Sequence, residues 1–158
     1  MADVVFRVVV SSTFRDLREW REAVRDAALG QSMLPLMMEH DAAIADRGII
    51  SNSLAKVDEA NAYVVLISNY RYGQVVVDPV LNPDALSVTE LEFGRAEQKG
   101  LPICVFLMDE NVPVSPAEMR KEAQWQEKLL AFRARGQHPS RITATFASAE
   151  DLKAKVVL

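Results

Sequence analysis

Glu92 is the residue of this sequence whose position most strongly suggests chemistry. It lies in the segment Ser87–Gly100, which also contains Glu90 and Glu97. At about 100° per residue, Glu92 falls near the middle of the apolar side of a helix, whereas the other two acids fall together on the opposite side. A carboxylate that faces a core costs free energy unless it is paired or its pKa rises. Glu92 is therefore a candidate catalytic residue.

Each of these acids also has a structural alternative. Ser87-Val88-Thr89-Glu90 has the pattern of a capping box, so Glu90 is expected to reach back to the backbone at Ser87. For Glu92, the alternative is an ion pair with one of three basic residues, namely Arg95, Lys99 or Arg71.

A polar loop follows the first predicted strand. It consists of Ser11, Ser12, Thr13, Phe14, Arg15 and Asp16. Hydroxyl groups that lead into a helix N-terminus favour an anion such as phosphate, and Arg15 adds a planar fork that suits it. The alternative is that Ser12 or Thr13 only caps the helix and that Arg15 pairs with Glu19. The loop has neither a glycine fingerprint nor a P-loop, so it does not support binding of a dinucleotide or a nucleoside triphosphate in the manner of those motifs.

A second polar loop follows the third predicted strand and contains Tyr70, Arg71, Tyr72 and Gly73. Aromatic rings stack on flat heterocycles, and an arginine binds phosphate or carboxylate. We expect this loop to bind a substrate. The alternative for each tyrosine is that its ring anchors the loop to the core.

Regular alternation of strands and helices positions these residues. The predicted strands are Val4–Ser11, Met33–Met38, Ala62–Ser68, Leu101–Met108 and Arg141–Phe146. The predicted helices are Phe14–Leu29, a helix from Ser51 or Ser53 to Ala60, Ser87–Gly100, a helix from Ser115 to about Arg135, and Ser148–Leu158. The long irregular stretch Val75–Leu86 contains the breakers Pro79, Asn82 and Pro83.

Five such units predict a three-layer α/β/α domain over residues 1–158, with a flavodoxin-like five-stranded parallel sheet in the order 2-1-3-4-5. In that order the loops leaving strands 1 and 3 diverge, and the crevice between them is the expected ligand site. The final helix has no C-terminal cap, so we expect the domain to be the N-terminal part of a longer protein.

Composition narrows the possible classes of function. The net charge of −4 argues against a general nucleic-acid binder, and no apolar run is long enough to span a bilayer. With one cysteine, Cys104 in an apolar run, an intrachain disulfide is impossible and a buried thiol is expected. His40 and His138 are expected at the surface, and no metal-ligand spacing is present. Together these features favour a cytoplasmic protein without a metal or a bound cofactor.

The segments SSTFRDL (Ser11–Leu17), RYG (Arg71–Gly73) and TELEF (Thr89–Phe93) resemble the DUF4062 family. Such domains typically precede larger regions, often an NTPase of the STAND type. The family in turn resembles TIR domains and nucleoside deoxyribosyltransferases, whose catalytic glutamate would correspond to Glu92. The tryptophan-cysteine segment of TIR domains is absent, and the Val75–Leu86 insertion departs from both relatives.

This resemblance implies an N-glycosidic bond hydrolase with a TIR-like fold, with NAD or a related nucleotide as substrate and a role as an effector in signalling or defence. Glu92 would act on the sugar, the Ser11–Arg15 loop would hold phosphate or ribose hydroxyls, and Tyr70 or Tyr72 would stack on the base beside Arg71. The alternative is a non-catalytic signalling module that binds a nucleotide, associates with itself or contacts a C-terminal effector region.

Overall fold

The computed structural model describes residues 5–13, 18–37, 48–139 and 141–156. The five strands are β1 (Arg7–Ser12), β2 (Leu34–Met37), β3 (Ala62–Ile67), β4 (Ile103–Met108) and β5 (Ile142–Phe146). The helices are α1 (Arg18–Gly30), α2 (Ile49–Glu59), α3 (Val88–Gln98), α4 (Pro116–Lys121), the 3-10 helix η2 (Ala123–Trp125), α5 (Gln126–Gly136) and α6 (Ala149–Lys155).

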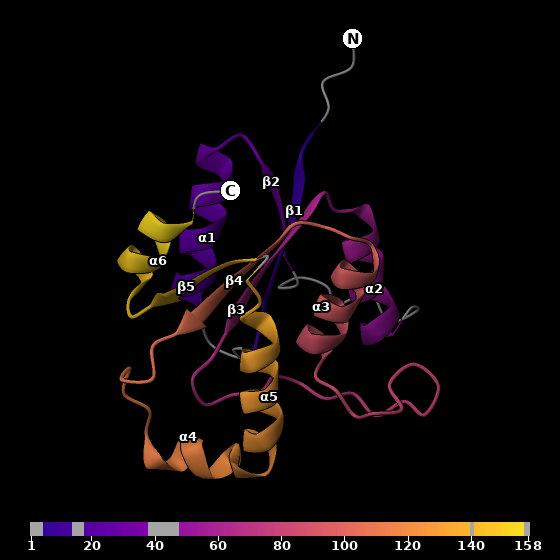
Figure 1. Cartoon of the computed structure of the whole chain (residues 1–158), viewed down its shortest axis with the longest axis vertical. Coiled ribbons are helices and arrows are strands. Elements are labelled where there is room, and N and C mark those ends of the chain that lie inside the picture. The colour runs from indigo at the N-terminus through magenta and orange to yellow at the C-terminus, as the bar shows by residue number, and fades with distance from the viewer. Residues whose placement is uncertain (1–4, 14–17, 38–47, 140, 157–158) are drawn as a thin grey trace.

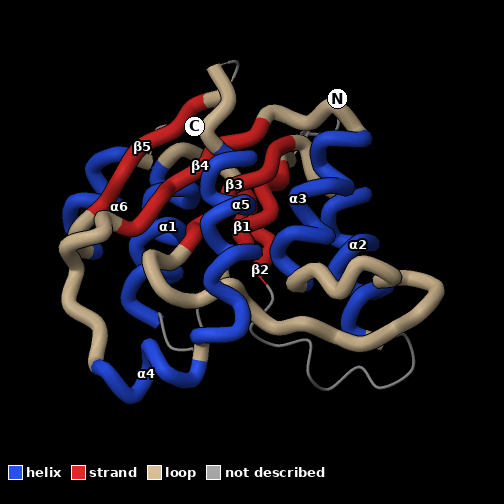
Figure 2. The backbone as a smooth tube through the Cα atoms, turned by 60° about the horizontal axis from the view of Figure 1, so that its bottom comes forward, coloured by secondary structure: helices blue, strands red, loops and turns tan. Residues whose placement is uncertain are grey.

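The strands form one parallel sheet in the order β2-β1-β3-β4-β5, which confirms the predicted topology. Helices cover both faces, with α1 and α6 on one side and α2, α3 and α5 on the other (Figure 1). Figure 2 shows the same layers from another direction, with the red strands between blue helices. The domain is therefore a three-layer α/β/α fold with flavodoxin-like topology.

Two apolar clusters account for the layers. Alternating residues of each central strand point to opposite faces, so that Val8 and Val10 of β1 join one cluster whereas Val9 joins the other. On the α1 and α6 side, Trp20 packs on Phe146 with their ring centroids 5.0 Å apart. The predicted burial of Cys104 is confirmed, since its thiol lies in this cluster.

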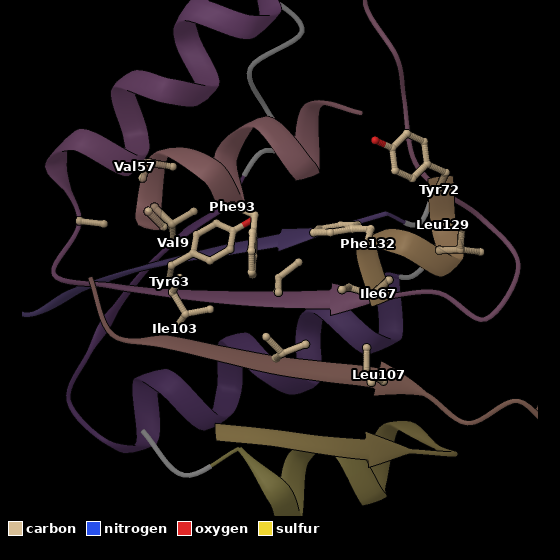
Figure 3. Packing of buried hydrophobic residues seen from close by; sticks show 14 residues of the cluster. Val9, Val57, Tyr63, Ile67, Tyr72, Phe93, Ile103, Leu107, Leu129 and Phe132 are labelled. Atoms are coloured by element: carbon tan, nitrogen blue, oxygen red, sulfur yellow. The ribbon is translucent and has the colours of Figure 1, made fainter. Parts of the chain in front are cut away.

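The second cluster packs α2, α3 and α5 against the other face of the sheet. Phe93 of α3 lies between Tyr63 of β3 and Phe132 of α5, with edge-on ring contacts to both (Figure 3). Gly136 brings α5 close to the sheet, because a Cβ at this position would lie 3.1 Å from a methyl of Val105. These contacts fix α3 and α5 against the same face of the sheet.

Several predicted boundaries need correction. The helix expected from Ser51 or Ser53 begins at Ile49, after Gly48 at a φ of 69° and without a side-chain cap. The helix expected from Ser148 to Leu158 ends at Lys155, although Ser148 does cap it by accepting from the Asp151 N–H. The predicted start at Phe14–Leu17, the end of the second strand at Met38, and His40 lie outside the described residues.

The continuous helix predicted from Ser115 to about Arg135 is the largest error. Ser115 caps α4 as expected, by accepting from the backbone N–H of Glu118. The backbone then leaves the helical region at Glu122 (φ −100°, ψ 3°) and again at Trp125 (φ −103°, ψ 1°), and η2 follows the first break and ends at the second. The chain therefore turns at this point, and α5 starts in a new direction (Figure 1).

Candidate functional site

A cavity of about 460 Å³ lies beside the carboxyl ends of β1 and β3, where the crevice was predicted. Its volume lies in the range of small-molecule sites. The described residues that line it are Ser11, Ser12, Thr13, Arg21, Ile49, Arg71, Gly73, Gln74, Val75, Val88, Thr89, Glu92, Glu122 and Trp125.

Glu92 lines this cavity from α3, although its exposed fraction is only 2%. The Ser11 hydroxyl, at the end of β1, donates a hydrogen bond of 3.2 Å to Oε1 of Glu92. Oε2 is buried and has no hydrogen-bond partner among the described residues. A buried carboxylate with an unused oxygen beside a cavity is poised to interact with a ligand.

The rival ion pairs of Glu92 are not formed. Arg95 instead forms two hydrogen bonds with Asp58 on α2, of 2.8 and 2.9 Å. Lys99 donates to the backbone oxygen of the same Asp58 at 2.7 Å. Arg71 faces Glu122, with 4.0 Å between Nε and Oε1. None of the three basic residues named as partners in the structural alternative, all of which the structure describes, therefore pairs with Glu92.

Burial raises the pKa of Glu92 from 4.5 to about 8, because the ionised form loses its hydration. The Ser11 hydrogen bond and the positive charges of Lys56 and Arg21 oppose this effect. Burial also raises the pKa of Tyr63, and the negative charge of Glu92 raises it further. A positive group in the cavity would favour the ionised form of Glu92.

The Ser11–Thr13 segment connects the carboxyl ends of β1 and β3. The Thr13 N–H donates to the Leu66 oxygen at 3.1 Å, and its hydroxyl accepts from the Ser68 N–H at 2.9 Å. The Thr89 hydroxyl donates to the Ser12 oxygen at 2.9 Å. Thr13 therefore links the end of β1 to the end of β3 beside the cavity. Phe14 and Arg15, which were predicted to bind substrate, lie outside the described residues.

Some residues of the Tyr70–Gly73 loop line the cavity, whereas Tyr72 is buried in the core. Arg71 and Gly73 line the cavity, as predicted. Tyr72 is fully buried and its hydroxyl donates to Glu90. Because its ring belongs to the core, the prediction that it stacks on a ligand needs correction. Tyr70 does not line the cavity, and its N–H donates to the Ser68 hydroxyl.

Gly73 allows a close approach of three segments. Its φ is 107°, a value that side chains disfavour, and an added Cβ would lie 3.3 Å from Cβ of Ser87 and 3.4 Å from Cα of Thr13. The loop after β3 therefore packs against both the loop after β1 and the start of α3.

Glu90 has a different role from the one predicted. The Ser87 hydroxyl does accept from the Glu90 N–H at 3.2 Å, which confirms half of the capping box. The Glu90 carboxylate, however, binds the Tyr72 hydroxyl and Arg135 (2.9 Å). These are stronger partners for a charged group than a backbone N–H, because one carries a full positive charge. Glu97 also binds Arg135, which confirms that the two acids share a side of the helix.

Arg21, Glu122 and Trp125 line the cavity and were missed by sequence reasoning. Glu122 directly precedes η2 and Trp125 is its last residue, so their approach to the cavity depends on the break between α4 and α5. No glycine or proline lies between Ala117 and Arg135 to mark that break, so it could not be predicted from local residue types.

Within the described residues, no group of His, Cys, Asp and Glu side chains is arranged to hold a metal ion. His138 is exposed, as predicted. In the same part of the chain, no helix has both the length and the apolar character needed to cross a bilayer.

The fold and the site together define a doubly wound α/β domain with a buried carboxylate in the crevice at its topological switch point. The chain belongs to the family described as "Domain of unknown function (DUF4062)", whose model matches residues 7–157. A comparison with curated proteins finds no match. Among solved structures, the chain is similar to the TIR domains in the structure of the activated Roq1 resistosome directly recognizing the pathogen effector XopQ. The identity is 16%, the TM-score is 0.48, and the alignment covers 82% of this chain and 76% of the other. This similarity concerns the fold alone.

Proposed function

We propose that this domain cleaves the N-glycosidic bond of NAD or a closely related nucleotide, with Glu92 as the carboxylate that acts on the sugar. One observation carries the proposal. Glu92 is almost completely buried, lines a cavity of small-molecule size, and keeps one oxygen without a hydrogen-bond partner among the described residues. An arrangement of this kind costs stability and is characteristic of functional sites.

The reaction requires stabilisation of positive charge on the sugar. The bond between ribose C1 and the ring nitrogen breaks, and its electron pair leaves with the base. The ionised Glu92 carboxylate stabilises the cation-like C1, or binds it covalently as in retaining glycosidases. Water then adds to C1 and loses a proton. For NAD the products are ADP-ribose, nicotinamide and a proton.

The charge of the substrate fits the protonation behaviour of Glu92. With a pKa of about 8, Glu92 is mainly protonated at neutral pH unless a positive charge lies beside it. The nicotinamide ring of NAD is a cation, and a cation beside the carboxylate lowers its pKa and favours the ionised form. The same ring leaves as a neutral molecule, so its departure does not depend on a general acid.

The remaining polar groups suit the rest of such a nucleotide. Arg21 and Arg71 line the cavity, and each can bind phosphate through its planar guanidinium group. The Ser12 hydroxyl lines the same cavity and can bond ribose hydroxyls. In a signalling or defence protein, consumption of NAD by this domain would serve as the effector output.

The test is to incubate the domain with NAD, over a series of protein concentrations, and to measure released nicotinamide. We expect Glu92→Gln, which keeps the shape but removes the charge, to lower the rate by at least about 100-fold. Glu97→Gln is the matched control, because it alters an acid of the same helix that pairs with Arg135 and Arg141 outside the cavity. Wild-type activity in Glu92→Gln, or no nicotinamide at any concentration, would contradict the proposal.

A further inference from the structure

Trp125 forms an aromatic wall of the cavity. It is the only aromatic residue among the described lining residues, and it lies at the end of η2. Tyr72 lies behind it, with the two ring centroids 6.2 Å apart and the ring planes 26° from parallel. Tyr72 in turn makes an edge-on contact with Phe132. The indole is therefore the outermost ring of an aromatic stack that begins in the core.

The stack is held in place by contacts on both sides. The Tyr72 hydroxyl is fixed by Glu90, which also binds Arg135. Next to Trp125, the Gln126 side chain donates to the Tyr70 backbone oxygen at 2.8 Å. Such support reduces the entropy that a wall residue loses when a ligand binds.

Lys128 contacts both Trp125 and the long loop between β3 and α3. Its ammonium lies 5.9 Å from the centre of the Trp125 ring and donates to the backbone oxygens of Asp84 (2.8 Å) and Ala85 (2.6 Å). The position of Trp125 is therefore set by three segments: the Tyr70–Tyr72 loop, the loop that contains Asp84 and Ala85, and the first turn of α5.

We infer that Trp125 is the specificity-determining residue that binds the flat ring of the substrate, in place of Tyr70 and Tyr72. This inference rests on the proposed function, because it assumes that the cavity holds a nucleotide. Indole offers the largest flat surface of the aromatic side chains for contact with a base. The carboxylate of Glu92 in the same cavity adds a preference for a base that is positively charged.

Fluorescence offers a direct readout, because the chain contains two tryptophans. Trp20 is buried in the opposite cluster, on the α1 and α6 side of the sheet. In a Trp20→Phe variant, Trp125 is the sole reporter, and we expect saturable quenching on titration with NAD. Trp125→Phe is the matched control. It keeps Trp20 alone, and we expect no change on titration.

Binding affinity gives the second readout. Stacking of one base on an aromatic ring contributes on the order of 1–3 kcal/mol. We therefore expect Trp125→Leu to weaken NAD binding at least about tenfold in calorimetry, with Trp125→Phe closer to wild type. These titrations use the Glu92→Gln background, so that the ligand is not consumed.

The possible outcomes separate this inference from the proposed function. Equal NAD affinity in Trp125→Leu and its parent, or binding without quenching in Trp20→Phe, would overturn the role of Trp125 and leave Glu92 untouched. Quenching and a loss of affinity in the Glu92→Gln background, together with no nicotinamide release by the protein that keeps Glu92, would support Trp125 and contradict the hydrolase. If NAD does not bind at all, both are contradicted.

Discussion

The Ser11 hydroxyl donates to Oε1 of Glu92 across 81 positions of the sequence, at 3.2 Å and away from solvent. The donor stands at the end of β1, and the acceptor is on the helix that leads from β3 to β4. This contact joins the two halves of the doubly wound sheet at the point where they diverge. It also stabilises the ionised carboxylate, because a hydrogen bond to the charged form lowers its pKa.

Replacing Ser11 with alanine should therefore raise the pKa of Glu92 further above its present value of about 8. If the ionised carboxylate is the active form, kcat/KM of wild type rises with pH up to about 8. In Ser11→Ala this rise moves to higher pH, and the rate at neutral pH falls by roughly tenfold. The measurement is the pH profile of nicotinamide release. Ser53→Ala is the control, since Ser53 is a buried hydroxyl that donates within α2 at 2.8 Å. An unshifted profile in Ser11→Ala would refute the coupling.

The raised pKa of Glu92 also predicts how stability depends on pH. Between pH 4.5 and about 8 the folded protein keeps a proton on Glu92 that the unfolded chain has lost. The contribution of Glu92 to stability is therefore fully present below pH 4.5 and is lost as the pH rises to about 8, by up to about 1.4 kcal/mol per pH unit.

Glu92→Gln does not titrate, so its free energy of unfolding relative to wild type should increase over the same pH window. Denaturant unfolding of both proteins at several pH values between 4 and 9 measures the difference. A difference that stays constant with pH would show that Glu92 has an ordinary pKa.

The Arg71–Glu122 pair predicts a competition with anionic ligands. With 4.0 Å between Nε and Oε1, Glu122 lies close enough to Arg71 to compete with a phosphate for the guanidinium. Glu122→Gln should therefore strengthen binding of ADP-ribose by a few-fold, about the contribution of a partly exposed pair. Glu118→Gln is the control, because it removes an acid of α4 that pairs with Lys121 away from the cavity. Calorimetry in low salt gives the comparison, and weaker binding in Glu122→Gln would argue that this acid contacts the ligand instead.

Gly73 should be sensitive to any side chain. Its positive φ and the 3.3 Å approach to Ser87 predict that Gly73→Ala loses about 1–3 kcal/mol of stability. Gly30→Ala is the comparison, since no heavy atom would lie within 4 Å of its added Cβ. Thermal unfolding of both variants measures the contrast. Equal Tm values would show that the loop relaxes without cost.

Much of this architecture was predictable because its determinants are local. The central strands are buried on both faces and therefore appear as continuous apolar runs such as Ala62–Ile67. Glu92 was identifiable for the opposite reason, as a charge on the apolar side of a helix. Once the strand order was assigned, the crevice followed from the divergence of the loops.

The errors involve contacts that no local pattern encodes. Glu90 has the spacing of a cap residue, but the folded chain brings Arg135 and Tyr72 within reach of its carboxylate. Trp125 lies in a stretch with helical composition, and its place in the cavity depends on a break that tertiary contacts of Gln126 and Lys128 support. Tyr70 and Tyr72 had the chemistry of ligand-binding residues, yet burial assigns Tyr72 to the core.

The close contact of Gly136 with Val105 leaves little room for a side chain at the last residue of α5. Trp125 precedes the first residue of the same helix, roughly 16 Å away along its axis. A substitution at Gly136 that shifts α5 would therefore also displace the cavity wall, although Gly136 itself does not line the cavity.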